Sequence, residues 1–336
     1  MKYKRLGKTD INAPVLSFGA SVFNNFFKDA NFNYTPESLQ NVKDIISKAF
    51  SLGINYFDVA PWYGNAQQLL AIGLKDHQRS SYYLTTKVGR YNVEKDPTEW
   101  FDFSYQRTIS SVNESLAIFN TSYIDLIQIH DFEFAEDISQ IVNETLPALN
   151  ELRNQGKVRY IGINSYSLEK LKELLELSPI RIDTILAYTH LTLDDTSLLD
   201  YTEYFRNKGV GIINSAPLSM GLLTDVGPPV WHRAPENVKK AAREANDYCK
   251  SKGVSLSKLA IHFSATNNQI DTTLVSMSSE KLVQENVDSL NDLNENEKDV
   301  LNEIREKFFI PLNYKGYGDA ELISYRKKIQ TNKEEH

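Results

Sequence analysis

The segment Gly53-Ile54-Asn55-Tyr56-Phe57-Asp58-Val59-Ala60-Pro61 decides how this chain can fold. Residues 54–60 form a short apolar run, rich in aromatic and β-branched side chains, that stops at a proline. This composition predicts a buried strand. Residues 35–52 precede it with apolar side chains at helical spacing, and Gly53 is a typical helix stop. A helix therefore leads through one tight turn into a buried strand.

The same alternation continues outward in both directions. The spacing predicts further strands at 15–18, 82–88, 124–130, 158–163, 184–188, 210–215 and 272–276. It predicts further helices at 67–76, 104–119, 138–154, 168–177, 196–208, 237–252 and 257–266. Strands that alternate with helices form βαβ units and a parallel sheet. We therefore expect an α/β fold, a (β/α)₈ TIM barrel. An open Rossmann sheet is the alternative, but its G-x-G-x-x-G turn is absent.

No linker of Gly, Ser or Pro divides the chain, so we expect one barrel domain over residues 1–336. The basic segment 1–14 is expected to form a hairpin or plug beneath the barrel. The polar tail 327–336 is expected to fray.

Composition narrows the classes of function. Hydrophobic residues make up 41% and charged residues 24%, which is typical of a globular protein. The net charge of −7 disfavours nucleic acid as a partner, and no apolar run is long enough for a membrane helix. The lone cysteine, Cys249, forbids an internal disulfide and favours a cytoplasmic protein. The oligomeric state is left open.

Polar side chains gather at the predicted strand ends. Asp58, Lys87 and His130 end the second, third and fourth strands, and Tyr63 follows in the loop after Asp58. Active sites of these barrels lie at the C-terminal ends of the strands, so the four side chains should converge.

The four groups suit one kind of chemistry. A nearby ammonium lowers the pKa of a phenol, and a carboxylate holds the ammonium charged and in place. The phenol then becomes an acid and base usable near neutral pH, while a neutral imidazole holds the substrate oxygen. This suits hydride transfer at a carbonyl carbon, for which a nicotinamide cofactor must be the hydride partner.

A metal centre is the competing interpretation, and we predict none. Two clusters offer suitable ligand types: His130 with Asp131 and Glu133, and His190 with Asp194 and Asp195. Neither shows the H-E-x-x-H spacing, and the lysine beside the first cluster would oppose a cation.

The residues around these side chains resemble those of the aldo-keto reductase family. The match covers nearly the whole chain. Residues 53–64 are similar to the segment that carries the family's catalytic Asp and Tyr. Thr86-Lys87 is similar to the segment that carries the catalytic Lys, and residues 123–130 are similar to the strand that carries the His. The resemblance implies a nicotinamide-dependent oxidoreductase in which Tyr63 is the acid and base.

Within the family, residues 88–91, 101–104, 130–134 and 216–232 resemble the branch that oxidises L-galactose at its anomeric carbon, with NAD, on a route to ascorbate. D-arabinose and L-fucose are neighbouring substrates for such a pocket. An NADPH-dependent reductase of general aldehydes and ketones remains an alternative. A regulatory subunit that binds the cofactor with little turnover is another.

The resemblance also implies the binding residues. Expected cofactor contacts are Asn164, Ser165, Ser215, Leu218, Gly221, Ser276, Ser278, Glu285 and Asn286; expected substrate contacts are Trp62, His130 and His190. The chain departs from the family pattern at three places. Asn164-Ser165 reverses the family's Ser-Asn order, and Leu186 lies near the position of a common Gln. Ser215 replaces the Tyr that stacks on the nicotinamide in the family. NAD is expected rather than NADP, because Ser276 and Leu282 stand where NADP-selective members carry Lys and Arg; Lys281 is the adjacent cation that could compensate.

Overall fold

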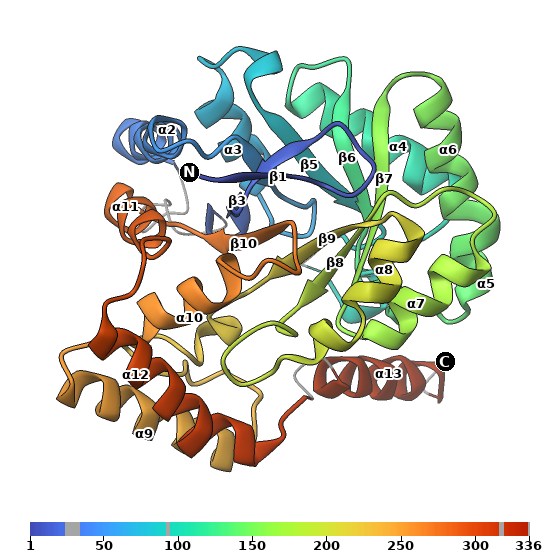
Figure 1. Cartoon of the computed structure of the whole chain (residues 1–336). Coiled ribbons are helices and arrows are strands. Elements are labelled where there is room, and N and C mark those ends of the chain that lie inside the picture. Colours follow the sequence, from blue (N-terminus) through green and yellow to red (C-terminus); the bar gives the residue numbers. More distant parts are fainter. Residues whose placement is uncertain (24–33, 92–94, 316–318, 335–336) are drawn as a thin grey trace.

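Parallel strands close into a barrel in the computed structural model, which describes residues 1–23, 34–91, 95–315 and 319–334. The strands follow the order β10-β3-β4-β5-β6-β7-β8-β9 around the barrel (Figure 1). Their bounds are β3 (Leu16–Gly19), β4 (Tyr56–Asp58), β5 (Tyr83–Val88), β6 (Ile124–Ile129), β7 (Val158–Ser165), β8 (Thr184–Tyr188), β9 (Gly211–Ser215) and β10 (Thr272–Ser276). The predicted (β/α)₈ barrel is confirmed.

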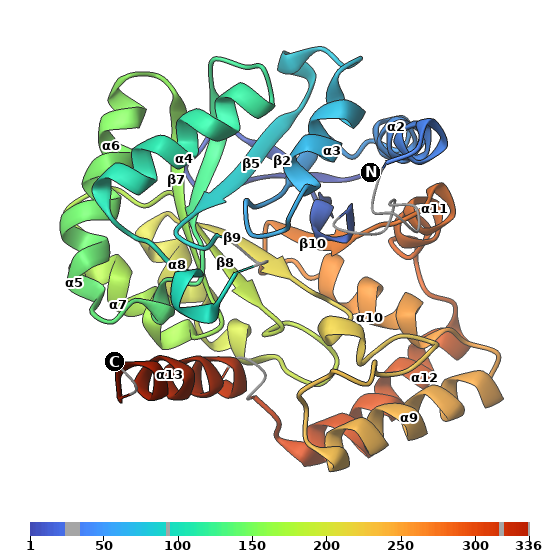
Figure 2. The same cartoon turned by 180° about the vertical axis from the view of Figure 1, so that it is seen from behind.

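Helices surround the barrel, as Figures 1 and 2 show from opposite sides. They are α2 (Pro36–Ser51), α3 (Ala66–Leu74), α4 (Tyr105–Ile118), α5 (Ile138–Gln140), α6 (Leu146–Asn154), α7 (Leu168–Leu177), α8 (Thr202–Lys208), α9 (Glu236–Ser251), α10 (Leu256–Ala265), α11 (Glu280–Asp288), α12 (Glu295–Ile304) and α13 (Asp319–Glu334). The predicted helix 196–208 is divided, because a 3₁₀ turn at Ser197–Asp200 precedes α8.

Local sequence explains where these helices begin. Thr35 precedes Pro36 at the first turn of α2, and its hydroxyl accepts the backbone N–H of Ser38 at 3.1 Å. This cap satisfies one of the free N–H groups of the first turn. The apolar stripe of α2, which includes Val42 and Ile46, is buried in the same core as the outward side chain of Phe57. Burial of that stripe supplies most of the helix's stability.

An N-terminal hairpin closes one end of the barrel. Strands β1 (Tyr3–Arg5) and β2 (Asn12–Pro14) pair antiparallel, and Leu6 between them is fully buried among barrel-interior side chains such as Leu126. Gly7 has a φ of +56°, and a Cβ built there would lie 2.3 Å from the backbone nitrogen of Gly211. The hairpin backbone therefore rests directly on the strand end.

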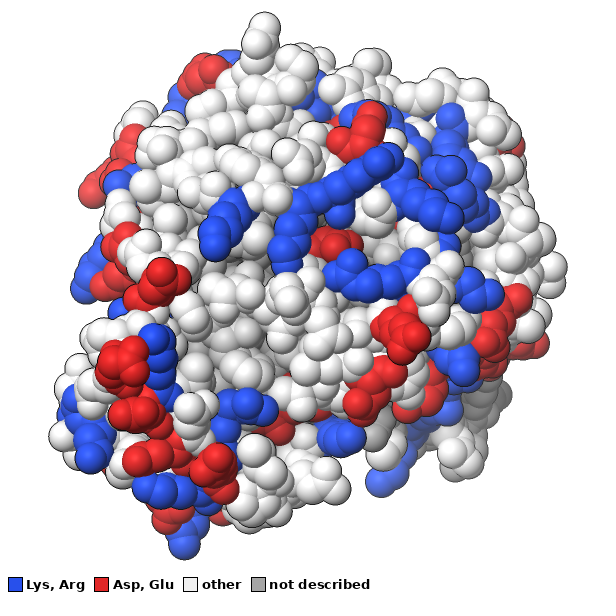
Figure 3. All heavy atoms as spheres, in the orientation of Figure 1, with Lys and Arg blue, Asp and Glu red and all other residues white. Residues whose placement is uncertain are grey.

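Basic side chains gather around this hairpin (Figure 3). Lys4 Nζ donates to the carbonyls of Asn267 at 2.9 Å and Ile270 at 2.8 Å. Arg159 forms an ion pair with Asp10 at 2.6 Å. These positive charges therefore hold the hairpin on the barrel.

The C-terminal residues differ from the expectation of a frayed tail, since α13 is helical as far as Glu334. Tyr325 of α13 packs its ring against Phe101 and Phe134, at centroid distances of 5.2 and 5.3 Å. Residues 319–334 carry no continuous apolar stripe that would have predicted a packed helix, because α13 is anchored by a few contacts. None of the helices formed by the described residues is long and apolar enough to cross a membrane.

Candidate active site

A buried ion pair joins the ends of two neighbouring strands. Asp58 ends β4 and Lys87 lies near the end of β5; Lys87 Nζ donates to Asp58 Oδ1 and, at 2.9 Å, to the carbonyl of Val59. The other carboxylate oxygen, Asp58 Oδ2, accepts from Thr85 at 2.7 Å and Gln128 at 2.9 Å. Burial lowers the pKa of Lys87, but Asp58 and Tyr63 raise it above its ordinary value. The lysine is therefore charged and fixed in position.

Tyr63 lies against this ion pair. Lys87 Nζ is 5.3 Å from the centroid of the Tyr63 ring, and the His130 ring lies edge-on to it, at 5.8 Å and 82°. Burial raises the pKa of Tyr63, and Lys87 offsets part of that rise. The sequence predicted that Lys87 lowers the pKa of Tyr63 but did not predict the larger, opposite effect of burial. Because burial has the larger effect, the phenol keeps its proton at neutral pH.

His130 is neutral in this setting. Burial, with the charges of Lys87 and Arg90, holds the pKa of His130 well below its ordinary value. Its Nδ1 atom is buried and has no hydrogen-bond partner among the described residues. A neutral imidazole beside a phenol can hydrogen-bond a substrate oxygen without competing for the proton.

A second phenol supports the first. Tyr188, at the end of β8, forms a side-chain hydrogen bond that lowers the pKa of Tyr63. The Tyr188 hydroxyl is in turn held by Asn164 Nδ2 at 3.1 Å, while Asn164 Oδ1 accepts the backbone N–H of Asp131 at 2.7 Å. The Asn164 amide is thus engaged with the protein at both its polar atoms.

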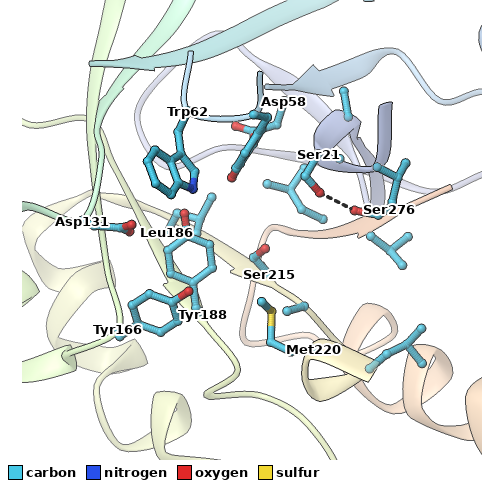
Figure 4. Close-up of a pocket in the computed structure, with 18 of the residues that line it drawn as sticks. Ser21, Asp58, Trp62, Asp131, Tyr166, Leu186, Tyr188, Ser215, Met220 and Ser276 are labelled. Carbon is cyan, nitrogen blue, oxygen red and sulfur yellow. Dashed lines mark hydrogen bonds between the residues drawn. The ribbon is translucent and has the colours of Figure 1, made fainter. Parts of the chain in front are cut away.

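These groups open onto a cavity of about 540 Å³ at the C-terminal ends of the strands (Figure 4). Residues predicted from the sequence that line it are Asp58, Trp62, Tyr63, His130, Ser215, Leu218, Gly221 and Ser276. Lining residues that sequence reasoning did not single out as contacts include Ser21, Arg90, Asp131, Tyr166, Tyr188, Met220, Trp231 and Glu321. Asp131 lies directly after a predicted strand and Arg90 lies two residues after another, and this position was the signal that could have identified them.

The other predicted contacts lie outside the cavity lining. Asn164 and Ser165 are buried at the end of β7, and Ser165 accepts the backbone N–H of Ser167 at 2.8 Å. Ser278 follows β10. Glu285 and Asn286 lie on α11, where Glu285 pairs with Lys281 at 3.5 Å.

His190 is also absent from the cavity lining. Its Nδ1 atom lies 2.9 Å from both Asp195 and Ser197, and its Nε2 atom lies 2.6 Å from the carbonyl of Tyr166. Both ring nitrogens are therefore used within the protein. The expected contact with a sugar is replaced by a structural role, which is to hold the backbone that carries Tyr166.

Comparisons with known proteins agree with this geometry. The Aldo/keto reductase family profile matches residues 18–307. L-galactose dehydrogenase of Arabidopsis thaliana is 40% identical over 298 residues, which cover 87% of this chain and 89% of that protein. D-arabinose 1-dehydrogenase of Saccharomyces cerevisiae is 30% identical over 260 residues, or 74% of each chain. The solved structure of a holo aldo-keto reductase from Bacillus halodurans superposes with a TM-score of 0.69 at 26% identity, covering 90% of this chain and 96% of that one.

The fold and the site define an oxidoreductase built on a parallel barrel. The chain belongs to the aldo-keto reductase family.

Aldo-keto reductases use nicotinamide cofactors, and this cavity fits such a group. Its wall at the ends of β3, β9 and β10 is built from small residues, Gly19, Ser21, Ser215, Ala216 and Ser276, which leave room for a flat ring beside Tyr63. The backbone is left-handed at Ala216, with φ +59°, and at Met220, with φ +55°. Such strained conformations gather at ligand sites.

Proposed function

We propose that this chain is an NAD-dependent dehydrogenase that oxidises an aldose, L-galactose, at its anomeric carbon to the aldonolactone. The observation that carries the proposal is that Tyr63 and neutral His130 line one cavity and that Lys87 lies directly behind Tyr63, 5.3 Å from its ring centroid. The similarity to L-galactose and D-arabinose dehydrogenases supports the sugar as substrate class.

The residues divide the work of the oxidation. His130 orients the anomeric oxygen, and Tyr63 as phenolate takes the proton of the anomeric hydroxyl. Lys87 stabilises that phenolate, and Asp58 holds Lys87 in place. A nicotinamide cofactor, when bound, would supply the acceptor for the hydride that leaves the anomeric carbon. In the reverse direction, Tyr63 returns its proton to the carbonyl oxygen.

The residues that we propose to bind the cofactor lie on the small-residue wall of the cavity, away from Trp62. Ser215, Leu218, Gly221 and Ser276 line that wall. We assign Ser278, Glu285 and Asn286 to the adenine end. Asn164 and Ser165 are engaged within the protein and lie outside the cavity lining, so we assign them to the support of the nicotinamide end and not to direct contact. Trp62 is the proposed aromatic wall of the sugar pocket.

We propose NAD as the partner because no cation faces a ribose 2′-phosphate at the expected positions. Ser276 Oγ hydrogen-bonds with Ser21 Oγ at 2.9 Å, and Leu282 is an apolar, exposed side chain. Lys281, the cation that could compensate, lies 3.5 Å from the carboxylate of Glu285.

The direct test is a set of initial rates with NAD and with NADP against L-galactose, L-fucose, D-arabinose and D-galactose. NAD-linked oxidation that strongly favours L-galactose is expected. No sugar oxidation, with brisk NADPH-linked reduction of simple aldehydes, would overturn the sugar and the cofactor. Tight nucleotide binding with negligible turnover on every substrate would instead favour a regulatory subunit.

Replacing Tyr63 by Phe removes the proton carrier while keeping the ring. We expect kcat to fall by about 10²- to 10⁴-fold, the usual contribution of general acid–base catalysis. Cofactor affinity, measured by quenching of protein fluorescence, should stay nearly unchanged. A Tyr63→Phe enzyme that keeps most of its kcat would refute the assignment.

A further inference from the structure

Three charged side chains meet at the side of the cavity that carries Trp62, away from the small-residue wall. Arg90 follows β5, Asp131 follows β6, and Glu321 comes from α13. Arg90 Nη1 donates to Asp131 Oδ2 at 2.5 Å and Nη2 donates to Glu321 Oε1 at 2.7 Å. All three line the cavity, and their side chains are 5%, 1% and 16% exposed.

One oxygen of this cluster lacks a partner. Asp131 Oδ1 is buried and accepts no hydrogen bond from the described residues. An unsatisfied buried acceptor is costly to the folded state, so its retention calls for a functional cause. Figure 4 shows the Asp131 carboxylate directed into the cavity, below Trp62. The free oxygen is therefore available to a donor that enters the cavity.

The carboxylate is held firmly in this orientation. Arg90 holds its other oxygen, and the backbone N–H of Asp131, in a left-handed conformation with φ +50°, donates to Asn164. The guanidinium of Arg90 is itself stacked on the Trp62 ring at 4.1 Å. The acceptor is therefore preorganised before any ligand arrives.

The position of Asp131 relative to the reacting centre defines the ligand. Asp131 Oδ2 lies 3.6 Å from His130 Nε2, and His130 is the group that holds the reacting oxygen. Asp131 and His130 are therefore neighbouring side chains of one cavity wall, and we place the hydroxyl next to the reacting carbon beside Asp131 when the carbonyl lies at His130. The Trp62 face offers an apolar surface to the C–H side of the same molecule.

We propose that Arg90, Asp131 and Glu321 form a hydroxyl-recognition subsite that selects polyhydroxylated substrates over plain aldehydes. The proposal rests on the proposed function and names the residues that set its specificity. Asp131 accepts the hydroxyl hydrogen, while Arg90 and Glu321 position Asp131. The second oxygen of Glu321 pairs with Arg233, so two carboxylates face two guanidinium groups and their charges balance.

Glu321 gives this subsite an unusual origin in the chain. It lies beyond residues 18–307, the part that matches the family profile. Its second oxygen pairs with Arg233 at 3.2 Å, which ties α13 to the loop that follows β9. The identity of the α13 residue at position 321 therefore contributes to specificity from outside the shared barrel.

The test compares two aldehydes that differ in their hydroxyl groups, glyceraldehyde and propanal. The readout is the ratio of their kcat/KM values in the reductive direction, for wild type, Asp131→Asn and Glu321→Gln. Loss of a hydrogen bond to a charged group predicts a ratio about 10- to 100-fold lower in Asp131→Asn. A smaller fall in the ratio is expected for Glu321→Gln, which acts through Arg90.

Controls separate this role from general damage. Glu173→Gln removes an exposed carboxylate on α7, which pairs with Lys170 outside the cavity, and should leave both the rates and the ratio unchanged. Nucleotide binding and thermal denaturation establish that each variant is folded. If Asp131→Asn does not fold, Glu321→Gln still tests the subsite, because Glu321 lies on a peripheral helix and its replacement should leave the barrel folded.

The outcomes are distinct. A ratio within threefold of wild type in both folded variants, whether the rates stay or fall together, would overturn the subsite. If wild type fails to oxidise L-galactose but the ratio collapses in Asp131→Asn, the sugar assignment fails while the subsite stands. If L-galactose is oxidised and the ratio does not change, the proposed function stands and the subsite fails.

Discussion

Tyr63 is subject to two opposing influences on its proton. Burial raises the pKa of its phenol, whereas Lys87 and the hydrogen bond from Tyr188 lower it. Because burial is the larger effect, the resting enzyme holds a protonated phenol, which is the form needed to reduce a carbonyl. Oxidation instead needs the phenolate, so the two directions of the reaction should depend on pH in opposite ways.

We therefore expect kcat/KM for sugar oxidation to rise toward alkaline pH and that for aldehyde reduction to fall there. Because the pKa of Tyr63 lies above the ordinary value near 10, the rise in oxidation and the fall in reduction should both occur at the alkaline end of the profile. Paired pH–rate profiles from pH 6 to 10.5 check this. Flat oxidation rates over that range would show that another step limits the reaction or that Tyr63 is not the base.

Tyr188 gives a second prediction at this scale. Replacing Tyr188 by Phe removes a hydrogen bond that lowers the pKa of Tyr63, so the oxidation profile should move to higher pH. At pH 8 we expect a several-fold lower rate, recovered as the pH is raised. Tyr166→Phe is the matched control, because the Tyr166 ring packs against the Tyr188 ring at a centroid distance of 4.7 Å and a tilt of 31°. Equal shifts in both variants would indicate altered packing of the pair.

Among the elements, the barrel strands were predictable and the last helix was not. Each barrel strand carries its own apolar signal, and strand ends bring Asp58, Lys87 and His130 together by topology alone. Glu321 reaches Arg90 across 231 positions of sequence, and no local pattern reports such a contact. His190 was predicted as a substrate contact for a related reason. Its ring is held by the carbonyl of Tyr166, which follows a different strand, and no local pattern around His190 reports that contact.

The N-terminal hairpin offers a test of close backbone contact. In Gly7→Ala the new Cβ would lie 2.3 Å from the Gly211 nitrogen, and this backbone atom cannot move cheaply. Gly156→Ala is the matched control, because its φ of +73° imposes similar backbone strain with nothing within 4 Å. Urea unfolding should show Gly7→Ala to be less stable than the control by about 1–3 kcal/mol. Equal losses would mean that the hairpin does not press on β9.

The whole molecule should respond to its cofactor as a single folding unit. A ligand that binds the folded state alone stabilises it by about 2.7 kcal/mol at 100 times its Kd. We expect NAD to raise the melting temperature at concentrations where NADP has little effect. In the Ser276→Lys, Leu282→Arg double variant, which supplies cations for the 2′-phosphate, NADP should stabilise more strongly than it does in wild type. A larger shift with NADP in the unaltered chain would contradict the assignment of NAD.

The hairpin and α13 occupy opposite ends of the barrel, and this arrangement bears on how the enzyme can be handled. Leu6 is buried at the floor, whereas Glu321 borders the opening through which substrate must pass. An affinity tag, fusion partner or surface linkage attached after α13 would pull on the helix whose first turn carries Glu321. Attachment before Tyr3 would leave the opening unobstructed, so orientation on a sensor or resin should decide how much activity an immobilised preparation retains.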